Sequence, residues 1–559
     1  MYNSPYLKAM VFLEKKKLKG HTYWYASERR LVDGKIKRTW QEYLGTTETI
    51  IECMRKSKEL PHIKLKSFQY GKTAALLSIS DELNFIDIVN KHTNKKQIEG
   101  LTVGEYLLIN IIGRCDGALS ENAMQKWFDK SSLSLLWKFP HKLTCQNFLN
   151  HYKYIDHETS KKIEDDLCKN LIEKGITPKI LFLDETNWFC YIKKGEELPQ
   201  NGNNKQYRNH MKQICMGLAV SEDNIPFMHE VYEGNRHDAK IFSELLDALT
   251  KRLTHLNITT EEMILVFDKG NNSDINIEDA ISKMHIVASA KHNQAEDLLN
   301  VSLEDYKYLY TNSKGNEIHG YRKKYEFFGQ DFTTVVLYNK ASHKKQKMSY
   351  EASKAKICKK LEDLKRRLGS NRGKERDKSS VEREFNDIIH KDFRSIFGHK
   401  VGKIPRGKKK PSLKIWIEEE VENLRYAGFG KTIVFTDMHT WHSEKIAKTY
   451  NQKYLVEDDF KLLNDVLLVP VGPINHHKDF NIRAHVFLCI IGMIFYRYLA
   501  WKCKYLGLSL RRLVEELEGI HLALVQGKTD NKVDLVVEEM DAKQARLFSL
   551  LDLGKFMGK

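Results

Sequence analysis

The chain has 559 residues, with 91 Lys and Arg against 74 Asp and Glu, so its formal net charge is +17. Hydrophobic residues make up 41% of it and charged residues 30%, a balance that excludes a disordered or fibrous protein. The length predicts three or four domains at roughly 100–200 residues each. The positive charge favours a polyanionic partner, with nucleic acid ahead of an anionic membrane surface.

The sequence also argues against secretion and membrane insertion. Residues 1–18 lack the continuous apolar stretch of a secretory signal. The most apolar run, residues 486–496, has 11 residues, whereas a membrane span needs about 20. The nine cysteines are scattered and form no CxxC pair, which excludes a zinc ribbon and favours reduced thiols. We therefore expect a cytoplasmic protein that contacts no membrane and associates with the nucleoid when bound to DNA.

Two regions precede the central part of the chain. Residues 7–45 alternate apolar and polar residues around the turn signal Val32-Asp33-Gly34, which predicts a small β-hairpin region over 1–50. Residues 75–175, within the next region at 51–175, change to a helical spacing of apolar residues, for example over 101–115 and 161–174. We expect a helical domain there.

From residue 176 the pattern becomes one of strands and helices. The apolar run 179–184 ends in Asp184, and the apolar run 263–268 ends in Asp268. The pattern predicts strands at residues 179–184, 213–220, 226–231, 263–268 and 285–289, with helices at 238–253 and 276–283 before and after the fourth strand. Two later strands are predicted at 333–338 and 432–435. This succession predicts an α/β core. Further helices are expected at residues 443–450, 455–464 and 481–505.

Most of the charge excess lies in one stretch. Residues 344–410 contain 23 Lys and Arg against 9 Asp and Glu, a local excess of +14. The segment 350–368 predicts a helix with a narrow apolar stripe, at Ile357, Leu361, Leu364 and Leu368. A second helix is expected over 379–396. A flexible basic loop suited to phosphate neutralisation closes the stretch, with Lys408, Lys409 and Lys410. A solvated helical arm is the simpler alternative to DNA contact.

The two strand-terminal acids form the core of a candidate site. If the strands of Asp184 and Asp268 lie side by side in one sheet, both carboxylates reach the same edge. A third acid, Glu457, lies on an expected helix. Three acids from two strands and a helix suit a pair of hard divalent cations, which prefer oxygen ligands and lie about 3.5–4 Å apart in phosphoryl-transfer sites.

Each acid also has a simpler interpretation. A strand-terminal Asp is commonly a turn or helix-cap residue, and a Glu on a surface helix is commonly a solvated charge. Asp437 follows the strand at 432–435 and is the main rival to Glu457 as third acid. Glu185 is a poor ligand candidate, because its side chain would lie on the opposite face of the strand from Asp184.

Five motifs occur in the order of a known family. They are Asp184-Glu-Thr, Glu233-Gly-Asn-Arg-His-Asp238 after Pro226, Phe267-Asp-Lys-Gly270, Tyr450-Asn-Gln-Lys-Tyr-Leu-Val-Glu457 and Asn481-Ile-Arg-Ala-His485. This succession resembles the DDE transposases of bacterial and archaeal insertion sequences, in the IS-four-like group. The third acid of that group lies in a Tyr-x-x-Arg-x-x-x-Glu-x-x-x-x-x-x-Lys signature. The matching order covers residues 176–505.

The resemblance implies an RNase H-like core that cuts and rejoins DNA with two Mg²⁺ ions, for which Mn²⁺ could substitute. It also implies that the basic, mostly helical segment is a domain inserted into this core. The expected division is a β-hairpin region at 1–50, a helical DNA-end-binding domain at 51–175, the first part of the core at 176–340, the inserted domain at 341–425, the rest of the core at 426–505 and C-terminal helices at 506–559.

By match to the family, Asp184, Asp268 and Glu457 would be the catalytic and metal-binding residues. Two positions depart from the signature. Lys453 stands where the family has Arg, which removes the planar fork for bidentate phosphate contact, and Asn464 stands where it has Lys. Lys461 is the nearest cation after Glu457 and either substitutes for that Lys or pairs with Glu457. The expected DNA contacts are Lys453, Lys461, Tyr450, Arg483, Lys408, Lys409 and Lys410, with packing as the alternative for Tyr450 and Arg483.

We therefore expect a transposase that binds the terminal inverted repeats of an insertion sequence and catalyses metal-dependent DNA cleavage and strand transfer. Its partners would be double-stranded DNA, at the transposon ends and the target, and a second copy of the chain in a synaptic complex. The alternative is a non-catalytic DNA-binding protein derived from a transposase. A structural nuclease with the same core is a third interpretation.

Overall fold

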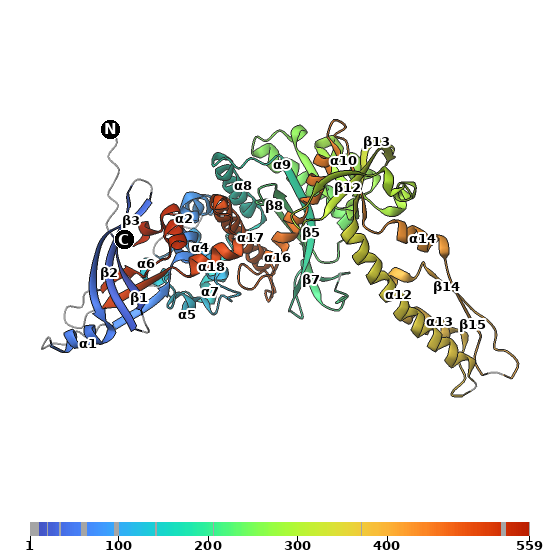
Figure 1. The fold of residues 1–559 in the computed structure, drawn as a ribbon, viewed down its shortest axis with the longest axis horizontal. Coiled ribbons are helices and arrows are strands. Elements are labelled where there is room, and N and C mark those ends of the chain that lie inside the picture. The colour runs from blue at the N-terminus through green and yellow to red at the C-terminus, as the bar shows by residue number, and fades with distance from the viewer. Residues whose placement is uncertain are drawn as a thin grey trace.

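The structure, a computed structural model, describes residues 10–18, 21–32, 35–56, 64–93, 100–139, 142–204, 206–236, 238–370, 372–407, 409–526 and 533–557. In these residues helices and strands form a mixed α/β architecture, as expected. Figure 1 shows an N-terminal sheet, a central body and a long arm that extends from the far side of the body. The central body holds the largest sheet and most of the buried apolar side chains.

The N-terminal sheet has three antiparallel strands, β1 (Met10–Leu18), β2 (His21–Val32) and β3 (Lys35–Thr46). β2 and β3 are the arms of the predicted hairpin, although residues 33 and 34 lie outside the described residues. β1 is an additional strand. Its Glu14 is buried and paired with Arg29 and Arg38, at 2.9 Å each. A buried charge of this kind interrupts the apolar alternation, so β1 is not recognisable as a strand from its pattern. The helix α1 (Thr47–Lys56) follows β3.

The expected helical region is present. Its longest helices are α2 (Gly71–Glu82), α4 (Val103–Cys115) and α8 (His157–Glu173). α4 begins at a capping box, in which the Thr102 side chain and Glu105 each accept from the other's backbone N–H. The shorter helices are α3 (Phe85–His92), α5 (Met124–Phe128), α6 (Leu133–Leu136) and α7 (Cys145–Tyr152).

The C-terminal segment corrects the expectation of helices alone. Besides α18 (Leu510–Glu518) and α19 (Ala542–Leu550), it contains β17 (His521–Gln526) and β18 (Val533–Val537). β17 pairs with β18 on one side and with β4 (Lys64–Gln69) on the other. The helices of the two regions also meet closely, since a Cβ on Gly71 would collide with the backbone carbonyl of Leu517. The helical region and the C-terminal segment therefore share one sheet and one core, in which β4 pairs with β17, a strand distant in sequence.

The central sheet has ten strands in the order β11-β12-β13-β16-β10-β9-β5-β7-β6, with β8 paired to β7. Around its middle, β5, β7 and β8 form an antiparallel meander, while β9 and β10 run parallel to β5. Its strands are β5 (Ile180–Cys190), β6 (Gln200–Asn201), β7 (Lys212–Ser221), β8 (Pro226–Glu233), β9 (Ile264–Phe267), β10 (His285–Ala290), β11 (Lys307–Thr311), β12 (Glu317–Phe327), β13 (Gln330–Asn339) and β16 (Lys431–Thr436). The predicted strands of the core are all among them.

Helices pack on this sheet and close its core. α9 and α10 lie against β8 and β10, and α15 and α16 lie against β10, β13 and β5. The rings of Phe242 on α9 and Phe267 on β9 lie 4.9 Å apart, and both are buried. The helices are α9 (Asp238–His255), α10 (Asp274–Lys283), α11 (Glu296–Leu299), α15 (Ser443–Asn451), α16 (Tyr454–Leu462) and α17 (Asp479–Lys502).

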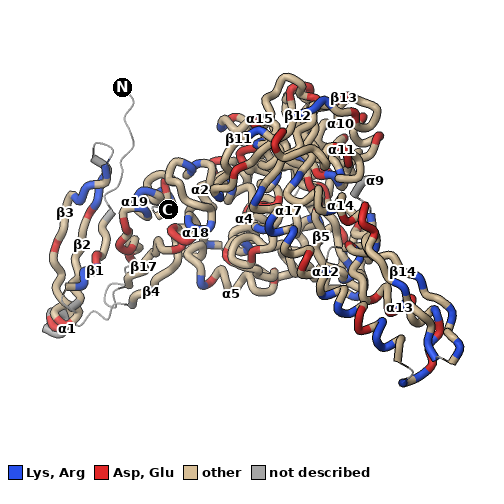
Figure 2. The backbone as a smooth tube through the Cα atoms, turned by 45° about the vertical axis from the view of Figure 1, so that its right-hand side comes forward, with Lys and Arg blue, Asp and Glu red and all other residues tan. Residues whose placement is uncertain are grey.

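The arm is the basic segment between the strands β13 and β16. It consists of α12 (Lys340–Gly369), α13 (Lys378–Ile388), β14 (Phe397–Val401), β15 (Leu413–Ile417) and α14 (Glu419–Ala427). The predicted stripe at Ile357, Leu361, Leu364 and Leu368 is buried, in a hydrophobic cluster of its own that includes Val381 and Phe385. Lys and Arg are spread along the whole arm in Figure 2.

Two expectations for the arm need correction. The second helix ends at Ile388, not at 396, because Ile389 and His390 take extended backbone conformations. The arm is also not only helical, because β14 and β15 pair as an antiparallel ribbon. The two ends of the arm meet where Asn339 donates its N–H to the carbonyl of Gly430 at 2.9 Å.

The apolar run 486–496 belongs to the longer helix α17, of 24 residues. In the described part of the chain, α17 is the one helix long and apolar enough to cross a membrane by length and composition. However, 83% of its apolar window is buried inside the protein. We therefore assign α17 to the protein core, as the central helix of the body. No disulfide joins the cysteines whose side chains the structure describes.

Candidate active site

Asp184 and Asp268 lie side by side at the same edge of the central sheet. Their strands, β5 and β9, are parallel neighbours with Phe182 opposite Val266. The two acids therefore occupy equivalent positions two residues further along. Each carboxylate accepts a hydrogen bond from the backbone N–H of the following residue, at 3.0 Å for Asp184 and 2.8 Å for Asp268. The structure thus brings the two strand-terminal acids together.

Lys453 joins these acids from the turn between α15 and α16. Its Nζ lies 3.1 Å from Oδ2 of Asp268, and its side chain is 12% exposed. Burial opposes its charge, but the carboxylates of Asp184 and Asp268 together raise the pKa of Lys453 above its ordinary value. In turn, burial raises the pKa of Asp268, but the stronger combined effect of Lys453 and the Lys269 N–H holds it below its usual range. Lys453 therefore acts on both acids at once.

Glu457 lies in the first turn of α16, which packs against β5. Trp188 of β5 fixes the end of this helix by donating its Nε1–H to Oδ1 of Asn464 at 3.0 Å. The Glu457 side chain is exposed to solvent. The phenol of Tyr450 reports on its position. Burial raises the pKa of Tyr450, and the nearby charges of Asp268 and Glu457 raise it further. Asp268 and Glu457 therefore both act electrostatically on this phenol.

The structure separates Asp437 from this group. Asp437 follows β16, which runs antiparallel to β10, so it lies at the opposite edge of the sheet. There Asp437 accepts from Nδ1 of His285 at 2.6 Å and from the N–H of Ile286 at 2.8 Å. Asp437 is therefore a cap at the start of β10. Glu185 accepts from the amide of Asn271 at 3.1 Å and serves a local structural role.

The other predicted DNA contacts differ in their surroundings. Tyr450 donates its hydroxyl to Oγ of Ser289 at 2.8 Å, so this group is used inside the protein. Lys461 pairs with Asp458 at 2.7 Å, and not with Glu457, and its side chain is 72% exposed. Arg483 donates to the carbonyl of Val231 at 2.8 Å and so holds α17 against β8.

The three lysines of the basic loop also differ from one another. Lys410 is buried, and its Nζ donates to the carbonyls of Arg367 and Arg372 at 2.7 and 2.8 Å. It fastens the loop to the end of α12 and is a structural residue, which corrects its prediction as a phosphate contact. Lys409 is exposed, and Lys408 lies outside the described residues.

A groove of about 1090 Å³ reaches Lys269, the residue after Asp268, and runs along the arm. Five cations line it, one of them adjacent in sequence to Asp268 and three on a single face of α12: Lys269, Lys345, Lys356, Lys360 and Arg425. This set of cations is not marked by any motif in the sequence. The helical spacing of Lys356 and Lys360 was a usable signal, but their approach to Lys269 depends on how the arm joins the core.

The donor set suits hard divalent cations. Asp184, Asp268 and Glu457 offer carboxylate oxygens from two strands and a helix, which is the ligand type that Mg²⁺ prefers. The Asp268 side chain is 41% exposed, and Glu457 is exposed, so both can be reached from solvent. The ammonium of Lys453 beside Asp268 shows that this edge of the sheet attracts positive charge. The chemistry of these oxygen donors therefore suits ions of this class.

No protein-family model matches the chain, and no curated protein matches it.

Proposed function

We propose that this chain is a DDE-type transposase with an RNase H-like catalytic core. The strand order supports this proposal. A three-strand meander, β5-β7-β8, is followed by β9 and β10, which lie on the other side of β5 and parallel to it. This is the succession of strands that the sequence resemblance implies, and the basic arm departs from the core between the second and third acids.

The observation that carries the proposal is the shared sheet edge of Asp184 and Asp268. Acids separated by more than 80 residues occupy equivalent positions on neighbouring parallel strands. Glu457 stands on a helix packed against the strand of Asp184. A lysine-lined groove includes Lys269, the residue after Asp268. Acids that converge beside a cationic groove favour metal-assisted chemistry on a polyanion.

Each element then has a role in phosphodiester cleavage. Asp184, Asp268 and Glu457 would hold two Mg²⁺ ions, and such ions would supply activation of the attacking oxygen and neutralisation of charge on the leaving oxygen. The lysines of the groove hold the DNA backbone in place, and Lys453 positions Asp268. Water would be the nucleophile in the first cut, attacking phosphorus while the P–O3′ bond breaks and leaves a 3′-hydroxyl. In strand transfer that hydroxyl would attack the phosphorus of a target phosphodiester, whose own P–O3′ bond breaks. The protein contributes mainly positioning and charge neutralisation.

The test is the nicking of supercoiled plasmid DNA that carries the sequences flanking this gene on both sides. We expect nicking that requires Mg²⁺ and is abolished by Asp184→Asn, because the amide loses the charge that holds the ions. Asp437→Asn is the matched control, since Asp437 also follows a core strand but lies at the opposite sheet edge. Equal nicking by Asp184→Asn and the unaltered protein contradicts the assignment.

A non-catalytic DNA-binding protein is the second candidate. The observation that favours it is the hydrogen bond from Trp188 to Asn464, which gives a structural role to the position where the family signature has a lysine. Salt-sensitive DNA binding, with no Mg²⁺-dependent nicking in the same assay, would establish this candidate. In both cases two DNA ends would be held by a dimer, which light scattering of the DNA complex measures.

A further inference from the structure

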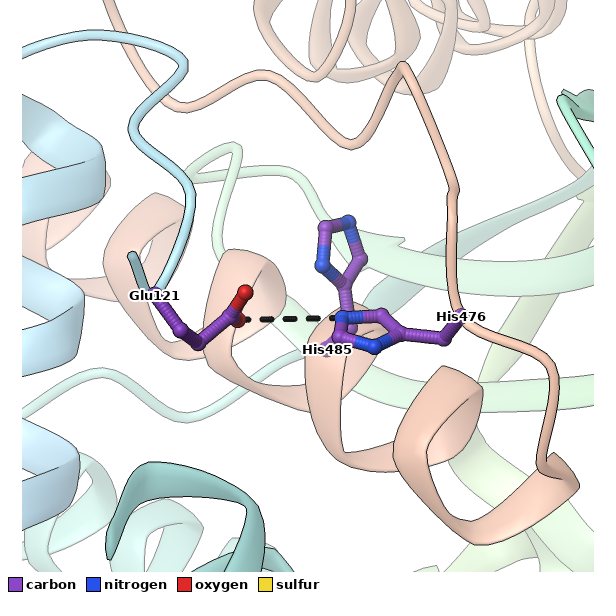
Figure 3. A group of neighbouring side chains, drawn as sticks. All are labelled: Glu121, His476 and His485. Carbon is purple, nitrogen blue, oxygen red and sulfur yellow. Dashed lines mark ion pairs between the residues drawn. The ribbon is translucent and has the colours of Figure 1, made fainter. Parts of the chain in front are cut away.

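A second cluster of ligand-type side chains lies away from the sheet-edge acids. It surrounds a cavity of about 400 Å³ between the helical region and the segment that leads into α17. Glu121 comes from the segment after α4, His476 from the segment before α17, and His485 from α17 itself (Figure 3). One oxygen or nitrogen atom from each of the three lies within 4.8 Å of the others.

His485 presents a nitrogen lone pair to this cavity. Its Nε2 lies 2.7 Å from the carbonyl oxygen of Val471. A carbonyl only accepts, so Nε2 carries the proton and Nδ1 carries the lone pair. The residue is 3% exposed, and Nδ1 has no hydrogen-bond partner in the described part of the chain. An imidazole whose other nitrogen is fixed by a carbonyl is in the arrangement typical of a metal ligand.

Glu121 and His476 complete the group. Oε1 of Glu121 lies 3.7 Å from Nε2 of His476, the contact marked in Figure 3. The same oxygen accepts hydrogen bonds from Arg114 at 2.7 Å and from Tyr152 at 2.8 Å. These two donors lie outside the cluster and fix the orientation of the Glu121 carboxylate.

We propose that Glu121, His476 and His485 bind a Zn²⁺ ion, with the cavity leaving room for a water molecule as fourth ligand. Two imidazoles and one carboxylate are borderline ligands that suit Zn²⁺ in tetrahedral geometry, whereas Mg²⁺ favours an all-oxygen set. Arg114 and Tyr152 are hydrogen-bond partners of the ligand Glu121. The bound ion would tie α17 to the end of the helical region and thereby stabilise the contact between them.

This site shares no residue with the sheet-edge acids, so it can be tested independently of the proposed transposase activity. The full-length protein is stripped with a chelator, mixed with Zn²⁺ and passed through a desalting column, and the retained zinc is measured by mass spectrometry. We expect about one Zn²⁺ per chain. His476→Ala should lose it, while His477→Ala should keep it. His477 is exposed and contacts the carbonyl of Lys194, so it is the matched control.

Two further measurements separate this site from the proposed active site and from misfolding. Asp184→Asn should retain zinc as the unaltered protein does. Zn²⁺ should raise the melting temperature of the unaltered protein by several degrees and leave that of His476→Ala unchanged, while both melt alike without zinc. The proposal is overturned if the unaltered protein retains no zinc, if His476→Ala retains as much, or if Asp184→Asn loses it.

Discussion

Lys453 is the residue at which the strand acids and the helical segment meet. Its ammonium lies 3.1 Å from Asp268 and interacts electrostatically with Asp184, and it occupies the position where the signature of the proposed family has arginine. The charge of lysine is concentrated on a compact ammonium group, whereas that of arginine is spread over a planar guanidinium with forked donors. In this chain the point charge acts on the carboxylates themselves, so Lys453 is a positioning residue for the acids as well as a candidate phosphate contact.

Replacing Lys453 should change the pH dependence of DNA nicking. Burial raises the pKa of Asp268 and Lys453 lowers it, so Lys453→Gln should move that pKa upward. A protonated Asp268 cannot hold a cation, and the acidic limb of the pH–rate profile should therefore shift to higher pH. Lys453→Arg keeps the charge and should restore the original limb. An unchanged profile in Lys453→Gln would mean that Lys453 does not act through Asp268.

A second prediction at the residue scale concerns Glu164 of α8, which lies in a buried cluster of charged side chains. Glu164 is 3% exposed and contacts both His229 and Arg252, while Arg252 also pairs with Asp165 at 2.8 Å. Burial opposes its charge, but His229 and Arg252 lower the pKa of Glu164 to about 2. Removing one partner of such a buried group costs about 3–5 kcal/mol, because the opposite charge remains buried without compensation.

Glu164→Gln should therefore lower the melting temperature at pH 7. The pKa of Glu164 is depressed in the folded state, so its contribution is fully present above its ordinary pKa of 4.5 and is lost as the pH falls towards about 2. The difference from the unaltered protein should then shrink between pH 5 and pH 3. Glu173→Gln, an exposed change on the same helix, should shift stability by less than about 0.5 kcal/mol.

At the scale of elements, α12 presents different lysines to different surroundings. Lys356 and Lys360 line the groove beside Lys269, whereas Lys359 and Lys365 are exposed on the same helix and are not part of that lining. If DNA lies in the groove, the two pairs have unequal effects although they carry the same charge.

The double variant Lys356→Ala/Lys360→Ala should weaken DNA binding and reduce the slope of log K against log salt by about 2, since each lost phosphate contact removes about one unit. The double variant Lys359→Ala/Lys365→Ala is the matched control and should retain most of the slope. Fluorescence anisotropy across a salt series measures both. Equal losses in the two variants would indicate a diffuse charge effect and no bound path along the groove.

The elements that could be predicted from the sequence are those with a local pattern. The runs that end in Asp184 and Asp268 are recognisable because a buried parallel strand is apolar throughout. The stripe on α12 is recognisable because one helix face is buried against the arm's own core. The function of Lys410 could not be predicted, because its partners are backbone carbonyls about 40 residues away. The cavity around His485 likewise joins three distant segments.

At the scale of the whole molecule, the helical region and the C-terminal segment form one sheet and pack their helices together. β4 is the edge of a sheet whose other strands are β17 and β18, and α2 packs against α18 and α17. The arm, by contrast, has a hydrophobic cluster separate from that of the body, and its two ends meet at Asn339 and Gly430. Removal of the C-terminal segment and removal of the arm should therefore have different consequences.

Truncation after residue 506 should give an insoluble or chaperone-bound protein, because it exposes the strand edge of β4 and the apolar side chains of α2. Replacing residues 341–429 with a two-residue Asn-Gly turn removes a longer segment but should leave the body soluble and folded. Soluble yield and circular dichroism compare the two variants. A soluble truncated protein would show that the helical region folds without its C-terminal partner.

The pairing of β4 with β17 also determines when the newly made chain can complete this sheet. Ser67 and His521, which lie 3.1 Å apart across this pair, are 454 residues apart in sequence. At about 5–20 residues per second, translation needs roughly 20–90 s to deliver the second strand after the first. During that interval β4 of the nascent chain has an unpaired strand edge. The N-terminal region therefore completes its folding late in synthesis, while ribosome-associated chaperones can still bind it.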